Sequence, residues 1–236
     1  MDSLFIVMPA YNEEENIEAV INQWYGILDG KSEKSRIVVA DSGSKDNTHT
    51  ILEELKRTRF PQLEILPTDN QYHGPKLIAL YKYAIDSGID YVFQTDSDGQ
   101  TNPEEFEAFW QQRKEYDGIF GNRVVRGDGK QRAIVEKVVC VLLKLFFKVQ
   151  VPDANAPFRL MKTSVVAKYI DRFSPDYFLP NIMLTTYFVY YGEKSKFAEI
   201  SFIPRQGGKN SINIGKIFKI GMKSLKDFYD FKKDMH

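Results

Sequence analysis

Short apolar runs alternate with amphipathic segments through the first half of the chain. A continuous apolar run such as residues 4–8 predicts a strand buried on both faces, whereas apolar residues three or four positions apart predict a helix. Strands are expected at residues 4–8, 36–40, 63–66, 91–95 and 119–120, separated by helices at 48–57, 75–87 and 103–114. The first helix is expected to begin directly after Asn12 as its N-cap, with Glu13, Glu14 and Glu15 in its first turn.

This alternation predicts βαβ units, because parallel strands need a crossover connection. The second half is less regular, with a helix expected at 131–148, strands near 158–161 and 197–203, and a last helix from about residue 213. No internal repeat or Pro/Gly-rich linker divides the chain. The expected fold is therefore a single α/β, Rossmann-like domain with a mostly parallel sheet, followed by an amphipathic C-terminal helix.

Composition narrows the possible functions. The chain has 236 residues with 32 Lys and Arg against 32 Asp and Glu, so its formal net charge of zero argues against a nucleic-acid binder. One cysteine, Cys140, excludes an internal disulfide framework and suits a reducing compartment. The apolar run at 4–8 is too short for a signal peptide, and no stretch is apolar enough to predict a membrane span.

Two carboxylates follow the strand expected at 91–95, in the sequence T-D-S-D-G-Q. Close, unpaired carboxylates resist joint ionisation, and a divalent cation relieves that repulsion. Asp96 and Asp98 therefore predict a site for Mg²⁺ or Mn²⁺, since oxygen ligands favour hard ions. A solvated acidic turn is the plainer reading. A D-x-D also occurs in haloacid-dehalogenase-like phosphatases, although there it follows the first strand.

Three polar loops follow expected strands, in an order and spacing that are more specific than any one of them. P-A-Y-N-E-E begins at Pro9, D-S-G-S-K-D-N-T at Asp41 and D-S-D-G-Q at Asp96. Together they resemble the family-2 glycosyltransferases of the GT-A fold. The resemblance implies a nucleotide site formed by Pro9, Tyr11, Glu13, Asp41 and Asp96. It also implies a metal site formed by Asp96, Asp98 and Gln100, with Asp98 as a catalytic residue.

Further segments resemble the branch of this family that acts on polyprenyl phosphates, which includes dolichol-phosphate mannose synthase. They are G-N-R ending at Arg123, the basic segment containing Arg132, D-A-N-A-P-F-R from Asp153, and R-Q-G-G-K-N-S from Arg205. The likeness implies that Arg123, Arg132, Arg205 and Ser211 bind the acceptor phosphate, with Arg123 and Arg205 as catalytic residues. The chain departs from that branch at Asn122, Glu136 and Pro157.

The absence of a pair of carboxylates near residue 176 bears on the class of acceptor. Enzymes that act on sugar hydroxyls need a carboxylate base, often from an E-D pair at the start of a late helix, whereas this segment reads D-Y-F-L-P-N-I. An acceptor phosphate is already anionic and needs cations instead. The expected reaction is inverting transfer from a nucleotide sugar, such as GDP-mannose or a UDP-hexose, to a polyprenyl or dolichyl phosphate. Transfer to a glycan hydroxyl, a phosphatase and a non-catalytic nucleotide-binding module are the alternatives, and Asp153 or Asp176 could still act as a base.

Two segments predict contact with a membrane surface. Residues 134–149 are mostly apolar with interspersed lysines, and residues 209–236 carry seven Lys against three Asp beside an apolar stripe. Packing on the domain or on a partner explains the last helix equally well. We expect a transferase domain at 1–205, with its nucleotide half at 1–122 and its acceptor half at 123–205, and a basic segment at 206–236. The expected location is the cytoplasmic face of the membrane. The protein is expected to act there alone, as a homo-oligomer or with a membrane-protein partner. The three histidines are scattered and predict no site.

Overall fold

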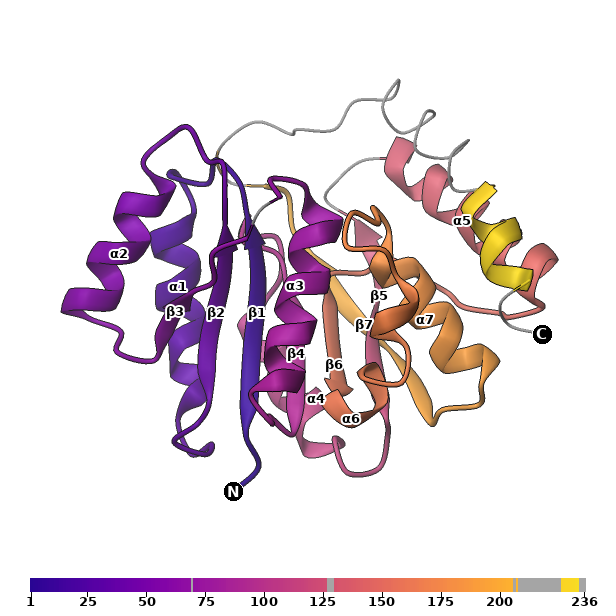
Figure 1. Ribbon diagram of the computed structural model, residues 1–236, viewed down its shortest axis with the longest axis horizontal. Coiled ribbons are helices and arrows are strands. Elements are labelled where there is room, and N and C mark those ends of the chain that lie inside the picture. The colour runs from indigo at the N-terminus through magenta and orange to yellow at the C-terminus, as the bar shows by residue number, and fades with distance from the viewer. Residues whose placement is uncertain (69, 127–129, 206, 208–225, 234–236) are drawn as a thin grey trace.

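The computed structural model describes residues 1–68, 70–126, 130–205, 207 and 226–233. They form one α/β domain built on a seven-stranded sheet (Figure 1). The strands are β1 (Leu4–Ala10), β2 (Arg36–Asp41), β3 (Leu63–Ile65), β4 (Tyr91–Thr95), β5 (Gly118–Arg126), β6 (Phe158–Lys162) and β7 (Ser195–Phe202). The α-helices are α1 (Ile17–Tyr25), α2 (Thr48–Thr58), α3 (His73–Asp86), α4 (Phe106–Gln111), α5 (Lys130–Phe147), α6 (Thr163–Val166) and α7 (Pro180–Tyr190). Short 3-10 helices occur at η1 (Gly26–Leu28), η2 (Pro103–Glu105) and η3 (Ile170–Arg172).

The sheet has the strand order β3-β2-β1-β4-β6-β5-β7. Pairing is parallel from β3 through β4 and between β5 and β7, and β6 runs antiparallel to both β4 and β5. The predicted mostly parallel sheet is therefore confirmed, with one reversed strand in its second half. Alternate residues of β1 enter different cores, Leu4 and Ile6 on one face and Phe5 and Val7 on the other.

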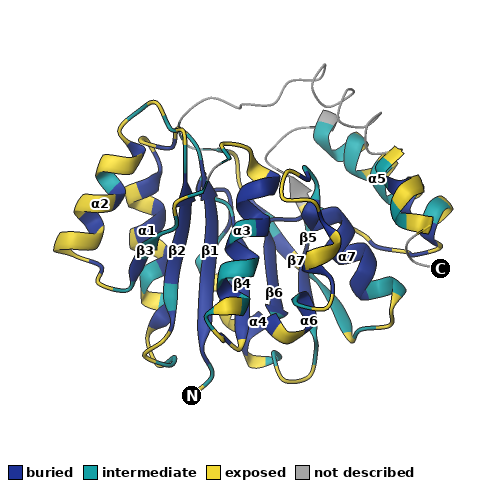
Figure 2. Cartoon of the chain, in the orientation of Figure 1, coloured by how far each residue is buried: buried dark blue, intermediate teal, exposed yellow. Residues whose placement is uncertain are grey.

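Helices cover both faces of the sheet. Apolar residues of α1, α2 and α4 form one core cluster, and those of α3, α5, α6 and α7 form the other. Figure 2 shows the central strands buried between these layers. This two-sided burial explains why the strands are read as continuous apolar runs in the sequence.

The chain reverses direction across the sheet at β1. The first three strands are added outward from β1 to β3, and the chain then returns to place β4 on the other side of β1. In doubly wound sheets a crevice opens at this reversal, beyond the carboxyl ends of the strands, and it is where ligands bind. The loops after β1, β2 and β4 all emerge at this edge.

Several predicted elements have different bounds in the structure. α1 begins at Ile17 rather than after Asn12, and Asn12 adopts a left-handed conformation with φ of 55°. The expected helix at 103–114 is divided into η2 and the short α4, and the expected two-residue strand at 119–120 is the longer β5. No helix was predicted at α7, because α7 is apolar on all sides and lacks the polar face that marks an amphipathic helix.

The described part of the C-terminal segment packs on the domain. Residues 226–233 are helical, and the ring of Phe228 is fully buried against Phe146 and Phe147 of α5. Phe231 meets the rings of Phe173 and Tyr177. Packing therefore accounts for this stretch, while residues 208–225, including the beginning of the predicted last helix, lie outside the described residues. No helix within the described ranges is long and apolar enough to span a bilayer.

Candidate active site

The loops after β1 and β2 are bound to each other. Asn12 Oδ1 accepts from the backbone nitrogen of Lys45 at 2.7 Å, and the backbone nitrogen of Glu13 donates to Thr48 Oγ1 at 2.8 Å. Glu14 Oε2 accepts from Asn47 at the start of α2. Asn12 and Glu14 thus support the neighbouring loop instead of capping α1. This is why the helix boundary predicted at Asn12 was wrong.

Lys76 joins the ends of the same two strands from the first turn of α3. Its fully buried ammonium group donates to the carbonyl oxygen of Ala10 at 2.6 Å and to that of Ser42 at 2.9 Å. The ring of Tyr11 lies over it, with its centroid 5.5 Å from Nζ. Burial lowers the pKa of Lys76 to about 8, against the opposing effect of the Asp41 charge.

Asp41 closes β2 with a carboxylate that is already hydrogen-bonded. Its Oδ1 accepts from Ser44 Oγ at 2.5 Å, and its Oδ2 lies 3.3 Å from Nδ1 of His49. The histidine was not predicted to take part in any site. His49 lies in the first turn of α2, next to the end of β2, and this position places it beside Asp41. The spacing of the three histidines in the sequence does not reveal this contact.

The third loop brings Asp96 and Asp98 to the same edge. Ser97 Oγ donates to the carbonyl oxygen of Pro9 at 2.8 Å and so connects this loop to the end of β1. Gly99 closes the turn with a φ of 74°, a conformation that favours glycine. His73 Nε2 lies 3.2 Å from Asp96 Oδ1, so a second histidine that was not predicted reaches a predicted site residue.

Arg205 lies against the carboxylates of the donor half. Its Nη2 contacts Glu13 Oε2 at 2.5 Å, and its Nη1 is 3.8 Å from Asp98 Oδ2. Burial raises the pKa of Asp98 to about 7, and the charge of neighbouring Asp96 adds to the shift. Burial also raises the pKa of Glu13, although Arg205 and Asn16 oppose it. The sequence assigned Arg205 to the acceptor phosphate, whereas its contacts lie with the predicted nucleotide and metal residues.

These carboxylates fit a hard divalent cation. Burial and the neighbouring Asp96 charge raise the pKa of Asp98, and a bound cation would relieve the cost of ionising this carboxyl there. The amide nitrogen of Gln100 donates to the carbonyl oxygen of Ile203 at 2.8 Å, leaving the amide oxygen as its possible ligand atom. No group of three or more His, Cys, Asp or Glu suited to a metal is found in the part of the chain that the structure describes. The two carboxylates and the amide oxygen would supply oxygen ligands, which Mg²⁺ and Mn²⁺ prefer.

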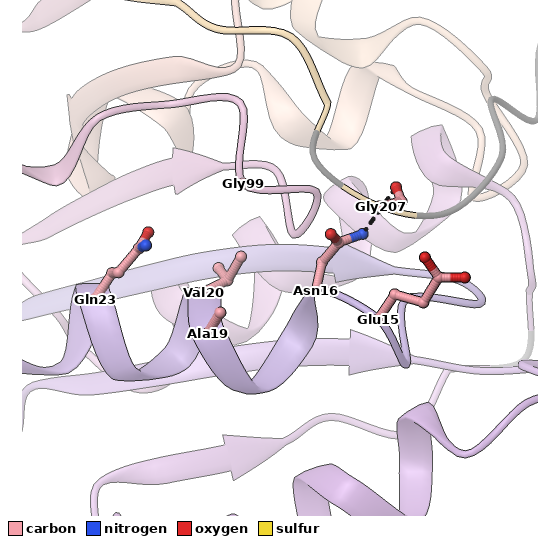
Figure 3. A pocket seen from close by; sticks show the side chains of 7 residues that line it. All are labelled: Glu15, Asn16, Ala19, Val20, Gln23, Gly99 and Gly207. Atoms are coloured by element: carbon pink, nitrogen blue, oxygen red, sulfur yellow. Dashed lines mark hydrogen bonds between the residues drawn. The ribbon is translucent and has the colours of Figure 1, made fainter.

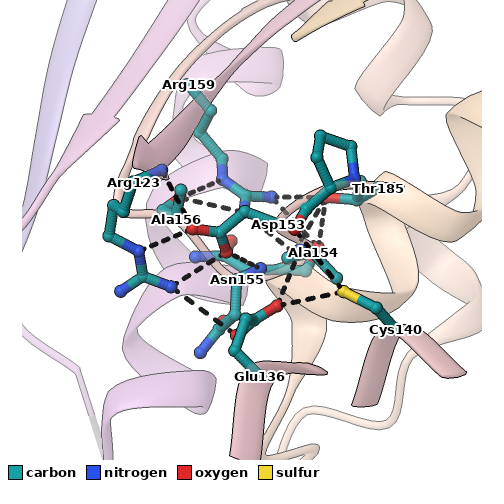
Figure 4. A network of polar contacts seen from close by, with 11 residues as sticks. Arg123, Glu136, Cys140, Asp153, Ala154, Asn155, Ala156, Arg159 and Thr185 are labelled. Carbon is teal, nitrogen blue, oxygen red and sulfur yellow. Dashed lines mark hydrogen bonds and ion pairs between the residues drawn. The ribbon is translucent and has the colours of Figure 1, made fainter. Parts of the chain in front are cut away.

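On the acceptor side, Arg123 takes part in a buried charge network (Figure 4). Its Nε and Nη2 contact the two carboxylate oxygens of Asp153 at 2.7 and 2.9 Å, a bidentate pair. Glu136 Oε2 lies 3.6 Å from Arg123 Nη2, and its Oε1 accepts from the backbone nitrogen of Ala154 at 2.8 Å. Glu136, where the related branch often has serine, thus attaches α5 to the segment before β6.

Arg159 stabilises the same segment from within the core. The fully buried guanidinium donates to the carbonyl oxygens of Ala154, Ala156 and Asn181. Cys140 is half-buried, and burial next to Glu136 raises the pKa of its thiol to about 12. The cysteine is therefore not a reactive thiolate at neutral pH.

The predicted site residues fall into two groups. Pro9, Tyr11, Glu13, Asp41, Asp96, Asp98 and Gln100 lie in or next to the three donor-side loops, together with Arg205. Arg123 lies in the acceptor network, and Arg132 is half-buried in the first turn of α5. Ser211 lies outside the described residues. The chemical role of each residue stays a prediction.

A pocket of about 280 Å³ opens beside the carboxylates of Glu13, Asp96 and Asp98, between α1 and the loop after β4 (Figure 3). Its lining residues are Glu15, Asn16, Ala19, Val20, Gln23, Gly99 and Gly207. The amide of Asn16 donates both to Glu13 Oε2 and to the carbonyl oxygen of Gly207. The pocket therefore lies next to the carboxylates without including Asp96 or Asp98.

The family of the chain follows from a match over most of its length. Residues 5–170 match the model of glycosyl transferase family 2. The chain belongs to this family. That region contains all three donor-side loops and the acceptor network, and the recognised family excludes the phosphatase and non-catalytic alternatives as readings of the D-x-D loop.

Curated relatives extend the likeness at low identity. An uncharacterized glycosyltransferase of Synechocystis sp. is 25% identical over 234 residues, covering 95% of this chain and 69% of its own length. The UDP-N-acetylglucosamine–dolichyl-phosphate N-acetylglucosaminyltransferase of Methanococcus voltae is 28% identical over 137 residues, 51% of this chain and 52% of that protein. The polyprenol monophosphomannose synthase of Mycolicibacterium smegmatis is 23% identical, covering 69% of this chain and 63% of that protein. The chain thus spans between about half and two thirds of the length of these relatives.

Solved structures share the fold. Glucosyl-3-phosphoglycerate synthase of Mycobacterium tuberculosis, in a complex with Mn²⁺, UDP and product, has a TM-score of 0.69 at 17% identity, over 96% of this chain and 80% of that one. TarS of S. aureus in complex with UDP-GlcNAc has a TM-score of 0.63 at 17% identity, over 91% of this chain and 62% of that one. The predicted GT-A fold is therefore confirmed.

Proposed function

We propose that this chain transfers a sugar from a nucleotide sugar to a polyprenyl phosphate at a membrane surface, with Mg²⁺ or Mn²⁺ on the donor diphosphate. Family membership supports a nucleotide-sugar donor. The names of the M. voltae and M. smegmatis relatives refer to lipid-phosphate chemistry. A further argument comes from α5, which connects the acceptor network to the protein surface.

The carrying observation is an apolar stripe along the outer face of α5. Ile134, Val138, Val141 and Leu145 are 62%, 53%, 56% and 69% exposed, at spacings of four, three and four residues that place them on one side of the helix. The first and last of these residues are eleven positions apart, which in a helix corresponds to about 16 Å. Lys137 and Lys144 are exposed alongside the stripe.

The position of the stripe suits a lipid acceptor. Glu136, on the same helix, points inward to Arg123 of β5, so the apolar stripe and the arginine lie on opposite sides of α5. A face of apolar side chains edged by lysines is typical of helices that lie in the interface of an anionic bilayer. We infer that α5 rests on the membrane and holds the acceptor phosphate near the site.

The chemistry then requires little from the protein beyond binding and orientation. Loops after β1 and β2 hold the nucleotide, and Asp96, Asp98 and Gln100 would hold the metal, which neutralises charge on the departing diphosphate. A lipid phosphate is anionic at neutral pH and needs no general base. As one of its oxygens bonds to the anomeric carbon, the bond from that carbon to the nucleoside diphosphate breaks, with inversion. Arg123, Arg132 and Arg205 are the proposed cations that orient the acceptor phosphate relative to the donor diphosphate.

Transfer to a glycan hydroxyl is the second candidate. It requires a carboxylate base, and Asp153 is held in a bidentate pair with Arg123 while Asp176 is exposed before α7. The first turn of α7 carries no carboxylate. These contacts favour the phosphate acceptor.

The deciding experiment measures labelled sugar transfer to polyprenyl phosphate in anionic vesicles, over a panel of nucleotide sugars with Mg²⁺ or Mn²⁺. The double variant Val141→Glu/Leu145→Glu should reduce that transfer at least about tenfold, because charged groups are costly in the apolar interface. Its slow transfer of sugar to water should be unchanged. Ala108→Glu, at an exposed position of α4, is the matched control and should behave as wild type. Transfer to saccharide hydroxyls but never to lipid phosphate would contradict the proposal.

A further inference from the structure

A chain of buried side-chain hydrogen bonds leads from the core of the domain to Asp96. Tyr81 Oη on α3 donates to Asn181 Oδ1 on α7 at 2.8 Å, and Asn181 Nδ2 donates to Gln94 Oε1 on β4 at 3.0 Å. Gln94 Nε2 then donates to Asp96 Oδ1 at 3.1 Å. Tyr81, Asn181 and Gln94 are all buried, so water does not compete for these bonds.

The direction of this chain is set by its end on a carboxylate. An ionised Asp96 accepts hydrogen bonds only, so Gln94 must turn its amide nitrogen toward it and its oxygen toward Asn181. Asn181 must then present its own nitrogen to Gln94 and its oxygen to Tyr81. Every donor therefore points toward Asp96, and each bond polarises the next in a low-dielectric interior.

Asn181 is also held through its backbone. Its carbonyl oxygen accepts from Arg159 Nη1 at 3.0 Å and from Thr185 Oγ1 at 2.9 Å. Arg159 is itself fully buried and bonded to the segment before β6. The first turn of α7 therefore cannot shift away from β4 without breaking buried bonds on both sides of the residue.

We propose that Asn181 is a positioning residue for Asp96, acting through Gln94 with Tyr81 behind it. This inference rests on the proposed function, since it assumes that Asp96 meets a cation on the donor diphosphate. Both Gln94 and His73 contact Oδ1 of Asp96. The chain of bonds thus fixes the carboxylate by one oxygen and leaves Oδ2 to face the cation.

This role explains why a polar residue interrupts the buried strand β4. Gln94 lies between Phe93 and Thr95 with no exposure to solvent, a costly place for an amide unless both of its ends are bonded. The chain of bonds also connects α7, which belongs to the acceptor half, with the metal ligand of the donor half. A disturbance at the start of α7 should therefore reach the metal site without any change in a metal ligand.

The test measures the affinity for Mn²⁺ by electron paramagnetic resonance of the free ion, with UDP or GDP present, alongside thermal unfolding without metal. In Asn181→Asp, residue 181 can no longer donate to Gln94, which must flip its amide and turn its carbonyl oxygen toward Asp96. We expect Mn²⁺ affinity to fall about 10-fold or more. A merely electrostatic effect of the added negative charge would strengthen cation binding, so the sign of the change separates the two.

Two further variants complete the test. Tyr81→Phe removes only the hydrogen-bond donor farthest from Asp96. It should weaken Mn²⁺ binding about two- to fivefold, a smaller loss than that of Asn181→Asp. Thr186→Val is the matched control, because Thr186 is equally buried on α7 but its hydroxyl donates to the carbonyl oxygen of Ile182, away from the chain. It should change thermal stability without changing Mn²⁺ affinity.

Wild-type Mn²⁺ affinity in a folded Asn181→Asp variant would overturn the positioning role. If that variant does not fold, Tyr81→Phe decides, and an unchanged affinity there overturns the role as well. The proposed function fails separately, because wild-type protein that binds Mn²⁺ but transfers no sugar to lipid phosphate would contradict the acceptor and leave the positioning role standing. Wild-type protein that binds no Mn²⁺ would overturn both.

Discussion

The proposed donor and acceptor sides of this domain are held together in different ways. On the donor side, three loops at the ends of parallel strands are joined mainly by hydrogen bonds between a side chain of one loop and the backbone of another, as with Asn12 and Ser97. On the acceptor side, the buried ions Arg123, Asp153 and Glu136 hold β5, α5 and the segment before β6 in place.

The difference shows how each side can change. Backbone-directed hydrogen bonds between the loops do not use the carboxylate groups of Asp96 and Asp98, so the donor side keeps its shape without using up its functional groups. In the acceptor network the functional candidate, Arg123, is itself part of the support. Substitutions should therefore separate stability from activity on the donor side and combine them on the acceptor side.

The largest expected effect is on the donor side. Asp98→Asn should lower metal-dependent transfer on the order of a thousandfold, since a lost metal contact costs several kcal/mol in the transition state. Apoprotein stability should stay equal or rise, because burial and Asp96 already oppose ionisation of Asp98 and raise its pKa. Steady-state kinetics and thermal unfolding check the two halves of this prediction. Asp86→Asn, at an exposed carboxylate near the end of α3, should change neither.

On the acceptor side, Asp153→Asn should lower the free energy of unfolding by about 3–5 kcal/mol, because it removes the charge of the bidentate pair with the buried Arg123 and leaves the more distant Glu136, at 3.6 Å, as the carboxylate beside it. Denaturant unfolding measures this. The donor-loop counterpart Asp46→Asn should cost about 1 kcal/mol or less, since Asp46 is more accessible and an amide oxygen can still accept from Thr48.

A double substitution sharpens the same contrast. Arg123→Met/Asp153→Leu removes both charges and should recover most of the lost stability, as apolar replacements of buried ion pairs often do. Transfer to lipid phosphate should not recover with it. Equal losses in Asp153→Asn and Asp46→Asn would show that the two sides are not held differently.

The smallest expected effect concerns Lys76, a buried charge on the donor side. Its pKa of about 8 in the folded protein lies below the ordinary 10.5, so between these values the unfolded chain binds a proton that the folded chain does not. Stability contributed by this group should therefore rise with pH across that window, by at most about 1.4 kcal/mol per pH unit. Unfolding free energies at pH 7.5 to 9.5 should rise more in wild type than in Lys76→Met, by roughly 1–2 kcal/mol. Lys82→Met, at a more exposed lysine of the same helix, should follow wild type, and parallel curves for all three proteins would contradict the lowered pKa.

Local sequence patterns were sufficient to predict the sheet and the donor loops. Apolar runs identify strands that are buried on both faces, and polar residues that end parallel strands must meet at one edge. The same patterns placed α1 too early, because Asn12 and Glu14 look like helix-capping residues but bond to the loop after β2. A local capping signal does not reveal that the side chain instead accepts a hydrogen bond from a backbone nitrogen far along the chain, as Asn12 does from Lys45.

The acceptor network and the bonds to Asp96 could not be derived in the same way. Arg123 and Glu136 were noticed only through the family resemblance, and their pairing with Asp153 depends on the reversed strand β6 and the placement of α5. Asn181 lies in a helix without polar periodicity, and His73 was set aside because the three histidines are scattered along the sequence. The signal that could have revealed the chain of bonds was Gln94, the one amide side chain in the fully buried strand β4.

The reversed strand also bears on how such a domain diversifies. The donor-side loops follow the carboxyl ends of their strands, at the site. An insertion in one of them therefore lengthens a loop without changing how the preceding strand pairs. Since β6 runs antiparallel to β4, the segment containing Asp153 enters the sheet at the same edge, with Phe158 paired to Thr95 directly after it. A change of length in this segment would disturb the buried hydrogen bonds that Ala154 and Ala156 make with Arg159. We therefore expect this segment to vary by exchange of side chains at fixed length more readily than by insertion or deletion.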